Sequence, residues 1–410
     1  MAKPTIRFRG FDYEWEQRKF GEITELKSAS RVHKDEWTSN GVPFYRSSDV
    51  MAAINGTENE KAFISEELYE KLSKVSGKLE EGDILVTGGG SVGNPYIVPD
   101  NKPLYTKDAD LLWIKNKGKF HPYFLYEFFF SPTFRNYLES ISHVGTIAHY
   151  TITQLSDTPI CLPSFDEQKE VGEYFQSLDN LITLHQRKCD ETKKLKKYML
   201  QNMFPENGSK VPEIRFKGFT DEWEQRKFGE IVEKYEDPIE TPTEGYTRLG
   251  IRSHAKGTFH SYVEKGKELE TAKMFRVAAD KFIVNITFGW EHAVAITDEN
   301  DAGKLVSHRF PQYSFNAGMN PNFFRYLILD ENFKHHLELS SPGGAGRNRV
   351  LKLSDMLEYK MNFPSEAEQK KIAAYFDDLD NLITLHQHKC EELKKLKKFM
   401  LQNMFTQKNK

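Results

Sequence analysis

Apolar side chains recur at intervals of three and four residues from Asp166 to Phe204, a stretch that contains no proline. This interval places them along one side of an α-helix. Ser164 and Glu167 have the spacing of a capping box, which marks a helix N-terminus. The pattern predicts one helix of 39 residues, about 58 Å long at 1.5 Å per residue. Its apolar positions are Val171, Tyr174, Leu178, Leu181, Ile182, Leu195 and Met199.

Most of the sequence of this helix occurs twice in the chain. Residues 178–204, LDNLITLHQRKCDETKKLKKYMLQNMF, return at 379–405 as LDNLITLHQHKCEELKKLKKFMLQNMF, with 23 of 27 positions identical. A second repeat lies upstream of each helix: PTIRFRGFDYEWEQRKFGEI at 4–23 returns as PEIRFKGFTDEWEQRKFGEI at 212–231, identical at 16 of 20 positions. The offsets of 201 and 208 residues show that one framework occurs twice in tandem.

Between the repeats the two copies share few residues but a similar plan of elements. The segments GDILVTGG and DKFIVNITFG are rich in β-favouring residues and predict strands, with YIVP, LLWIK and AVAIT as their partners. A Phe-rich helical stretch follows in each copy, HPYFLYEFFFSPTFRNYLES and NPNFFRYLILDENFKHHLELS. We therefore expect an α/β (α+β) protein with two domains built on small mixed sheets.

The charge along the long helix predicts how its two copies pair. Its first half is mainly acidic and its second half mainly basic, in both copies. Antiparallel pairing sets opposite charges against each other, and the helix dipoles favour the same arrangement. Such a pair has pseudo-two-fold symmetry about a point near His185 and His386, and inverts the two domains with respect to one another. Counting heptads with apolar residues at a and d, the predicted helix-pair interface comprises Val171, Tyr174, Leu178, Leu181, His185, Leu195, Met199, Leu379, Leu382, His386, Leu396 and Met400.

Composition narrows the class of protein. The 410 residues are 38% apolar and 29% charged, which is typical of folded domains. No apolar run is long enough to cross a membrane, and the N-terminus lacks a secretory signal, so we expect a cytoplasmic protein without a membrane partner. The three cysteines contain no CxxC pair and predict no disulfide framework. A net charge of -3 argues against nucleic-acid binding by bulk electrostatics alone, but leaves room for local basic surfaces.

Taken together, the repeats resemble one known family. The EWEQRKFGEI segments, the P-S-x-x-E-Q-K helix starts at 163–169 and 364–370, and the LDNLITLHQ helices look like the specificity (S) subunit of a type I restriction-modification system. The resemblance covers essentially the whole chain. It implies target-recognition domain 1 at 1–163, spacer helix 1 at 164–204, a linker at 205–213, target-recognition domain 2 at 214–364 and spacer helix 2 at 365–410.

The resemblance also implies a function. In this family each recognition domain reads one half of a bipartite double-stranded DNA target, and the two helices act as a ruler that sets the spacer. A helix of about 58 Å corresponds to about 17 base pairs at 3.4 Å per pair. The S subunit is not catalytic and binds no cofactor. It binds two methyltransferase (M) subunits, which use S-adenosylmethionine to methylate adenine at N6, and optionally two restriction (R) subunits, which use ATP and Mg.

Candidate DNA contacts are hydrogen-bond donors in loops of the two variable interiors. Arg can read guanine bidentately, and Asn or Gln can read adenine. The alternative for each residue is an ordinary solvated polar loop. The candidates are Arg46, Ser47 and Ser48 in FYRSSDV, Ser91 and Asn94 in the glycine loop, Thr146, His149 and Tyr150 in HVGTIAHYT, Arg248, Arg252, Ser253 and His254 in TRLGIRSHAKG, Trp290 and Glu291 in FGWEHA, and Arg347, Asn348 and Arg349 in SPGGAGRNRV.

Three further motifs have a plainer interpretation. Residues 88–93 match G-x-G-x-x-G, but a strand rather than the helix of a dinucleotide site is expected to follow them. The following Asn94-Pro95-Tyr96 lacks the second proline of an adenine methyltransferase motif. The spacing His185-x3-Cys189, repeated at His386 and Cys390, offers zinc-ligand types, yet a polar layer that fixes helix register is the favoured interpretation, and no metal is expected.

Two other functions compete with a specificity subunit. One is a free-standing DNA-modifying enzyme such as a fused nuclease or methyltransferase, although the chain shows neither a cofactor loop nor an acidic-Lys nuclease cluster. The other is a coiled-coil adaptor that does not bind DNA.

Overall fold

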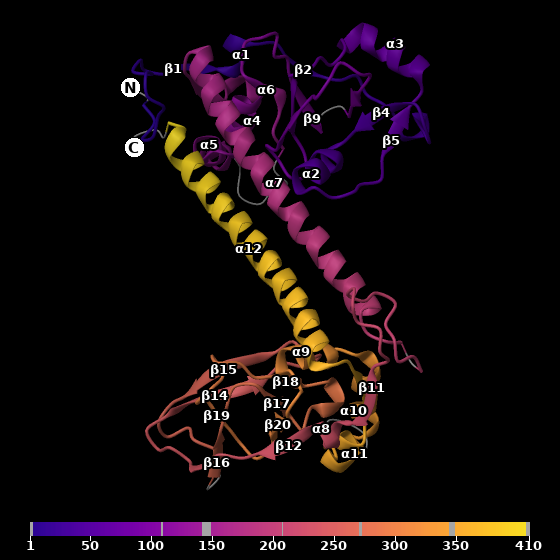
Figure 1. Ribbon diagram of the computed structural model, residues 1–410. Coiled ribbons are helices and arrows are strands. Elements are labelled where there is room, and N and C mark those ends of the chain that lie inside the picture. The colour runs from indigo at the N-terminus through magenta and orange to yellow at the C-terminus, as the bar shows by residue number, and fades with distance from the viewer. Residues whose placement is uncertain are drawn as a thin grey trace. The chain divides into compact units, whose positions relative to one another are not determined.

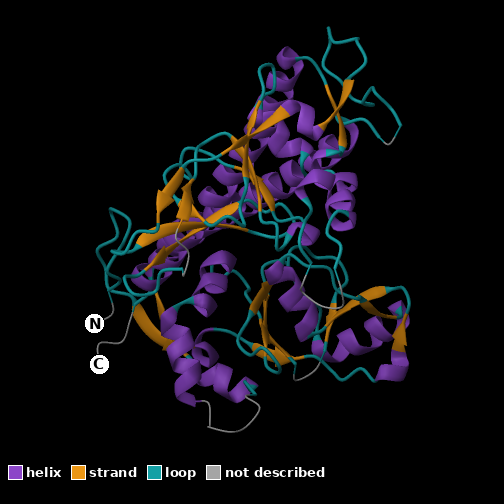
Figure 2. Cartoon of the chain, turned by 90° about the horizontal axis from the view of Figure 1, so that it is seen from below, coloured by secondary structure: helices purple, strands orange, loops and turns teal. Residues whose placement is uncertain are grey.

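The computed structural model describes residues 3–107, 110–141, 149–206, 208–269, 273–343 and 349–406. The chain forms two compact units. Unit 1 comprises Met1–Arg187 with Gln387–Lys410, and unit 2 comprises Lys188–His386. Both units mix helices and strands, as the sequence predicts (Figure 2). None of the helices formed by the described residues is both long and apolar enough to span a bilayer.

Unit 1 contains three small sheets. Strands β2, β9, β6 and β7 form a sheet in that order, β3, β5, β4 and β8 form a second one, and β1 pairs with β10. All pairings are antiparallel except β4 with β8. The elements are β1 (Glu16–Lys19), α1 (Phe20–Ile23), β2 (Leu26–Ser28), η1 (Lys34–Glu36), β3 (Trp37–Thr38), β4 (Val42–Tyr45), α2 (Ser47–Asn55), β5 (Ala62–Ile64), α3 (Glu66–Ser76), β6 (Ile84–Thr87), β7 (Pro95–Ile97), β8 (Tyr105–Thr106), β9 (Leu111–Ile114), α4 (Pro122–Phe130), α5 (Pro132–Ile141), α6 (Ile152–Asp157), β10 (Pro159–Leu162) and the start of α7 (Phe165–Asn202).

Unit 2 repeats the plan with one enlarged sheet. The order β12, β20, β17 and β18 corresponds to the first sheet of unit 1, β11 pairs with β21, and the remaining sheet has five strands in the order β13, β16, β19, β14 and β15. The elements are β11 (Glu224–Lys227), α8 (Phe228–Ile231), β12 (Val232–Tyr235), β13 (Pro238–Glu240), β14 (Tyr246–Ile251), β15 (Thr258–Val263), β16 (Lys273–Arg276), β17 (Lys281–Val284), η2 (Gly289–Glu291), β18 (Val294–Ile296), β19 (Leu305–Val306), β20 (Gln312–Phe315), α9 (Pro321–Leu327), α10 (Glu331–Leu339), α11 (Leu353–Leu357), β21 (Lys360–Phe363) and the start of α12 (Glu366–Met404).

The predicted strands and their pairing are confirmed. GDILVTGG supplies β6, which pairs with YIVP (β7) and LLWIK (β9), and DKFIVNITFG supplies β17, which pairs with AVAIT (β18). Each Phe-rich stretch forms two helices rather than one. In unit 1 the break falls at Ser131, whose N–H bonds to Phe128 O (3.0 Å) just before Pro132. A proline cannot continue the backbone ladder of the preceding helix, so α5 begins there.

The two long helices are confirmed and pair in antiparallel fashion within each unit (Figure 1). In unit 1, the Cys390 Sγ atom of α12 lies 4.0 Å from Ile182 O of α7, and Lys397 pairs with Asp179. In unit 2, the Cys189 Sγ atom lies 4.0 Å from Ile383 O, and Lys196 pairs with Asp380. Each of these contacts occurs in both units. The residue that α12 contributes in unit 1 corresponds, 201 positions earlier, to the residue that α7 contributes in unit 2, and the reverse holds for the partner.

The predicted register of the helix pair was wrong at four d positions, whereas Tyr174 is half-buried and packs against the unit 1 core. Leu181, Leu195, Leu382 and Leu396 are exposed by 41 to 44%. The side chains turned inward lie one residue further along, four after each a position instead of three. In both helices the a positions themselves are buried or half-buried. The inward residues of α7 are Phe175, Ile182, Cys189 and Lys196, followed by Met203 just after the helix, and those of α12 are Phe376, Ile383, Cys390, Lys397 and Met404.

Phenylalanines at the C-terminal ends of the long helices enter the unit cores. Phe405, just after α12, lies in the core of unit 1 with its ring centroid 5.3 Å from that of Phe124 and 6.1 Å from that of Phe175. Phe204, just after α7, does the same in unit 2, 5.7 Å from Phe323 and 6.1 Å from Phe376. Each core therefore includes an aromatic ring from the other repeat.

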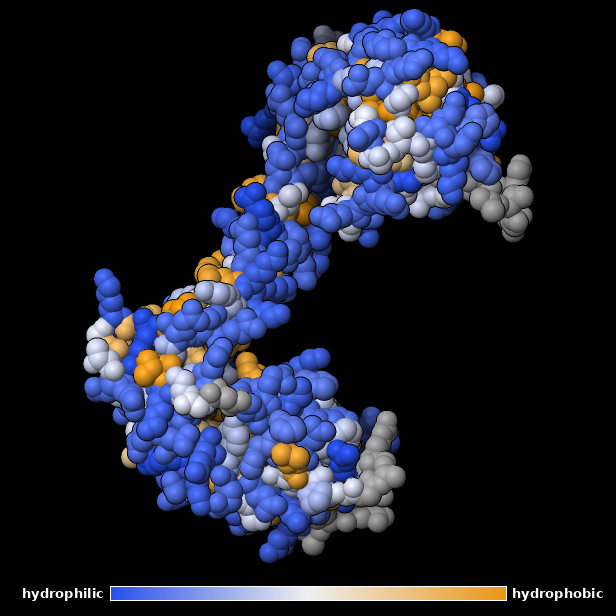
Figure 3. Space-filling model, turned by 90° about the vertical axis from the view of Figure 1, so that its right-hand side faces the viewer, coloured by the Kyte–Doolittle hydropathy of each residue, from blue (hydrophilic) through white to orange (hydrophobic). Residues whose placement is uncertain are grey.

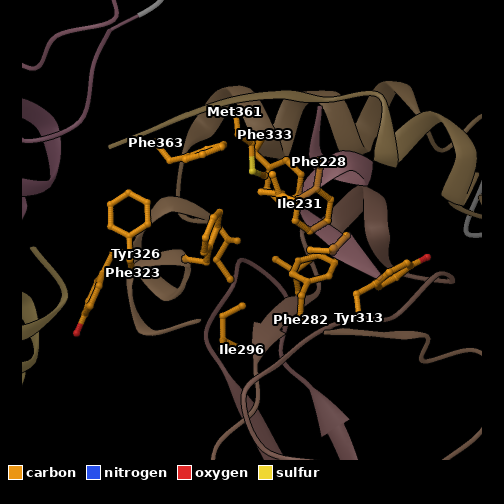
Figure 4. Packing of buried hydrophobic residues seen from close by; sticks show 14 of the residues in the cluster. Phe228, Ile231, Phe282, Ile296, Tyr313, Phe323, Tyr326, Phe333, Met361 and Phe363 are labelled. Carbon is orange, nitrogen blue, oxygen red and sulfur yellow. The ribbon is translucent and has the colours of Figure 1, made fainter. Parts of the chain in front are cut away.

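Part of the unit 2 core is a group of aromatic side chains between the sheet and the helices. Phe228 meets Phe282 edge to face at a centroid distance of 4.9 Å, and Phe333 lies beside both (Figure 4). Such pairs add about 0.5 to 1.5 kcal/mol each beyond the burial of their area. The group holds β17, α8 and α10 together and fixes the loop that follows β17.

A buried ion pair in each unit joins the two repeated segments. Arg7 binds Glu167 through two hydrogen bonds of 2.6 and 2.8 Å, and Arg215 binds Glu368 at 2.7 and 2.8 Å. Both glutamate side chains are 1% exposed. The predicted capping box is therefore not formed by Glu167, because its carboxylate is bound to the arginine. The Ser164 hydroxyl still accepts a hydrogen bond from Glu167 N–H, at 3.4 Å.

The third partner of the interhelical Lys–Asp pair differs between the units. In unit 1, Lys397 Nζ lies 2.7 Å from both Asp179 Oδ1 and Glu127 Oε1, and the Glu127 side chain is fully buried. In unit 2, α9 places Tyr326 at the corresponding position, where its hydroxyl donates to Asp377 (2.7 Å) and Asp380 (3.1 Å). Burial raises the pKa of Glu127 to about 8; the Lys397 charge opposes this shift and Asp179 adds to it.

This arrangement predicts a pH-dependent stability that unit 2 lacks. Glu127 holds its proton in the folded protein up to about pH 8, whereas the unfolded chain loses it near pH 4.5. Stability should therefore fall as pH rises between these values, by at most about 1.4 kcal/mol per pH unit. Thermal unfolding measured from pH 5.5 to 8.5 should show a shallower decline for Glu127→Gln than for the wild type.

Tyr326→Phe is the matched control. Burial raises the pKa of Tyr326 above its ordinary value of 10, so this hydroxyl does not titrate in the range and the pH profile should keep its slope. Equal slopes for Glu127→Gln and the wild type would contradict the assignment.

Candidate nucleic-acid interface

In unit 1 several loops meet where β6 ends. The Gly88 N–H donates to Asp110 O (2.7 Å), and the Tyr150 N–H donates to Gly88 O (2.8 Å). These bonds bring together residues 88–94, Asp110 and His149, which we call the β6 loop cluster. The loop is tightly packed at Gly93, whose φ is +76° and where an added Cβ would lie 2.9 Å from Phe134.

Unit 2 has the same backbone frame where β17 ends. The Ile286 N–H donates to Arg309 O (3.0 Å), and the Leu351 N–H donates to Ile286 O (2.8 Å). We call residues 285–292, Arg309 and Arg349 the β17 loop cluster. Asp110 and Arg309 thus take corresponding places just before β9 and β20, so one frame presents an acidic side chain in unit 1 and a basic one in unit 2.

The β6 loop cluster gathers four of the predicted DNA contacts. Ser47, at the start of α2, donates to Asp110 O (3.0 Å), and His149 faces Gly89. Ser91 O accepts from Asn94 Nδ2 (2.7 Å), and Asn94 Oδ1 accepts from Arg135 Nη2 (3.0 Å). Three separate segments therefore converge on the glycine loop.

The β17 loop cluster gathers four more predicted residues beside Glu291. Ser253 donates to Glu291 Oε2 (2.5 Å), and the His254 N–H donates to Glu291 O (2.8 Å). The Arg349 guanidinium lies over the Trp290 ring, 5.5 Å from its centroid. The side chains of this cluster combine aromatic surface with cationic donors, which is the composition that nucleic-acid surfaces use.

Other predicted contacts have structural roles. Arg46 Nε binds Asp49 at 2.9 Å and the guanidinium lies over the Trp37 ring, so part of its donor set is engaged within unit 1. Ser48 accepts from Asn59 Nδ2 at 3.2 Å. Tyr150 was predicted to face DNA, but it is 1% exposed and its hydroxyl bonds to Thr158 inside the core, where burial raises its pKa.

The remaining predicted DNA contacts lie in or near β14 or outside the described residues. Arg248 is a strand residue within β14, opposite Ser261 of β15. Arg252 donates to Thr258 O and lies over Phe259, 5.3 Å from the ring centroid. Thr146, Arg347 and Asn348 lie outside the described residues, and their assignment stays a prediction.

Sequence reasoning missed three side chains at these places. They are Asp110, Arg135 and Arg309. Asp110 and Arg309 lie just before predicted or observed strands, and this position could have drawn attention to them. Arg135 sits within a helix, and burial lowers its pKa; only the fold shows that it reaches the glycine loop.

The other motifs resolve as follows. A strand, β7, follows the glycine loop, as predicted for a site other than a dinucleotide site. In each half of the helix pair the cysteine faces a backbone carbonyl of the opposite helix at 4.0 Å. Among the described residues no three His, Cys, Asp or Glu side chains are arranged to hold a metal ion.

Comparison with known proteins decides the family. A model described as "Type I restriction modification DNA specificity domain" matches residues 13–194 and again residues 220–395. The chain belongs to this family. Each of its two copies of the specificity domain contains one of the loop clusters described above.

Relatives and a solved structure agree with this membership. The chain is 24% identical over 371 residues to the type I restriction enzyme MjaVIII specificity subunit of Methanocaldococcus jannaschii, covering 84% of both chains. It is 27% identical over 172 residues, 40% of its length and 41% of the relative's, to a putative specificity subunit, S.HindORF215P, of Haemophilus influenzae. The crystal structure of the type I restriction-modification S subunit from M. genitalium has the same fold, with a TM-score of 0.58 over 99% of this chain and all of that one, at 13% identity.

The structural role of Arg46 in the first specificity domain can be tested directly. Arg46→Ala leaves the Asp49 carboxylate, which is 8% exposed, without its charged partner, and should lower the free energy of unfolding by about 1 to 3 kcal/mol. Arg31→Ala, at an exposed arginine of the same unit, should change it by less than about 0.5 kcal/mol. Denaturant unfolding measures both. Equal stability of the two variants would contradict a structural role for Arg46 and leave it as a candidate DNA contact.

Proposed function

We propose that the chain is the DNA-specificity subunit of a type I restriction-modification complex, in which each unit reads one half of a bipartite double-stranded target. The observation that carries this proposal is the repeated backbone frame of the two loop clusters. The frame keeps the same hydrogen bonds at Gly88 and Ile286 while the side chains around it differ. Two surfaces built alike but chemically different suit the reading of two different base sequences.

The long helices have a separate role in this proposal. They set the spacer between the half-sites, and α7 and α12, with 38 and 39 residues, are each about 57 Å long at 1.5 Å per residue. The proposed recognition surfaces lie in the two loop clusters and not on the helices. The number of residues in each helix is therefore what sets the distance between the half-sites.

Each half of the helix pair also offers a surface for a partner. Unit 1 exposes Leu181, Leu396 and Phe399, and unit 2 exposes Leu195, Tyr198, Leu382 and Leu385. Most of the surface drawn in Figure 3 is hydrophilic, with hydrophobic residues gathered in separate patches. Large apolar side chains on a helix surface favour protein partners. Two M subunits, one for each half of the pair, are the partners we propose.

Catalysis belongs to the partners in this proposal. The M subunits use S-adenosylmethionine, and R subunits, where present, use ATP and Mg. The described residues of this chain supply DNA-facing loops, and the chain's net charge of -3 fits a subunit whose partners contribute phosphate contacts. A purified chain that by itself transferred methyl groups from S-adenosylmethionine would favour the enzyme alternative.

Domain exchange within the chain tests the proposal. Cells that express the wild-type chain with its M subunit should carry N6-methyladenine at one bipartite sequence. Replacing residues 27–160 by a copy of residues 234–359 should give a target in which both halves are the second half-site, in inverted orientation. Single-molecule methylome sequencing reads both halves and the spacer. Absence of any bipartite motif that depends on the wild-type chain would refute the proposal and favour the adaptor.

A second experiment tests the apolar surface of the helices. The double variant Leu396→Ser, Phe399→Ser removes two exposed apolar groups, each worth about 1.5 to 3 kcal/mol when fully buried, and should weaken binding of the M subunit at least about tenfold. Lys394→Ser, Lys398→Ser is the control on the same helix. Titration calorimetry with the M subunit measures both. Unchanged affinity of the first variant would place the M subunit elsewhere.

A further inference from the structure

Arg309 occupies a fixed position in the β17 loop cluster. Its carbonyl accepts from the Ile286 N–H at 3.0 Å, and its own N–H donates to Ser307 Oγ at 3.4 Å. On either side, the Phe310 N–H donates to Ser307 O (3.0 Å), and the Val284 N–H donates to Pro311 O (3.3 Å). The backbone is thus tied to β17, and the starting point of the side chain is set in advance.

The guanidinium of Arg309 differs from those of four other arginines in unit 2. Arg215, Arg226, Arg276 and Arg349 each pair with a carboxylate. Arg309 is exposed, and the side-chain bond that the structure gives it is to a neutral group, from Nη1 to Thr287 Oγ1 at 3.1 Å. That hydroxyl orients the guanidinium without neutralising its charge. Among the described residues no carboxylate forms an ion pair with it.

This geometry suits one kind of ligand. A guanidinium offers five N–H donors in a planar fork, and the bond to Thr287 uses one of them. The guanine edge in the major groove presents two acceptors, N7 and O6, which the fork matches with two parallel hydrogen bonds. The exposed Phe288 ring next to Thr287 adds apolar surface beside the donor.

The corresponding residue of unit 1 has the opposite hydrogen-bonding character. Asp110 presents only acceptors at the same place in the frame, and Lys107 pairs with it at 2.6 Å. The backbone at this position makes the same hydrogen bond in both units, while the side chain is an acceptor in unit 1 and a donor in unit 2. The two units therefore differ here in chemistry and not in backbone geometry.

We infer that Arg309 is a specificity-determining residue that selects guanine at one position of the half-site read by unit 2. This inference rests on the proposed function, since it assumes that the β17 loop cluster faces DNA.

Methylome sequencing of variants in complex with the M subunit tests the inference. In Arg309→Ala, selectivity for guanine at one position of one half-site should fall by about 10- to 100-fold. In Arg309→Gln, adenine should gain at that same position, because an amide matches N6 and N7 of adenine. The half-site read by unit 1 is the internal reference and should not change.

Arg276→Ala is the matched control, since Arg276 lies in β16 of another sheet and pairs with Asp237 at 3.2 Å. It should leave both half-sites unchanged. If the Arg309→Ala protein fails to accumulate, the test uses methylome sequencing of Arg309→Gln instead, because its amide can still donate to Thr287.

The outcomes separate the inference from the proposed function. A wild-type chain with no bipartite motif would overturn the proposed function. A wild-type motif that Arg309→Ala and Arg309→Gln leave unchanged would overturn the inference alone. Uniformly weaker methylation at all sequences would also overturn it, because that result marks a phosphate contact rather than a base contact.

Discussion

The antiparallel contact between α7 and α12 is the constraint on which the rest of the structure depends. Each half of this contact rests on an interhelical Lys–Asp pair, Lys397 with Asp179 in unit 1 and Lys196 with Asp380 in unit 2. Phe405 and Phe204 then complete the core of the unit formed mainly by the other repeat. The core of each unit therefore includes side chains of both repeats, and Met203 and Phe204 have the same place in unit 2 as Met404 and Phe405 have in unit 1.

The repeated segments act together because their residues meet in space. Arg7 and Glu167 are 160 positions apart, yet they form a buried pair at the start of α7, and Arg215 with Glu368 repeats it. The neighbouring Gln168 accepts from the His121 N–H and so joins α7 to α4. Gln369 accepts from the Asn320 N–H and joins α12 to α9 in the same way. These contacts hold the frame of each unit while the residues between the repeats are free to differ.

The sequence predicted the elements well and the contacts less well, for identifiable reasons. The central strands and long helices follow from local patterns in DILV, KFIV and the helix repeat. The d positions failed because leucines at 181 and 195 compete with Ile182 and Lys196 for the inward face, and a spacing of three or four residues fits a helix equally well. The inward Lys196 is compensated by Asp380, a contact between distant residues that a local pattern does not show.

The candidate DNA contacts were the hardest residues to predict because exposure and pairing decide which polar side chains remain available. Tyr150 and Arg46 are polar loop residues by sequence, yet one is packed in the core and the other is bound to Asp49. Arg309, in contrast, lies within an ordinary SHRF segment, and only the Ile286 bond shows its place in the frame.

If the loop clusters read DNA as proposed, substitutions there would change the target. Because the frame depends on backbone hydrogen bonds and buried aromatic packing, a substitution at position 110 or 309 alters the chemistry presented without loosening the strands behind it. Glu127 and Tyr326 are a contrasting case, since those side chains face the helix pair, where we expect Glu127 to affect the pH dependence of stability. Variation at the loop clusters and variation at the helix pair therefore act on separate properties of one fold.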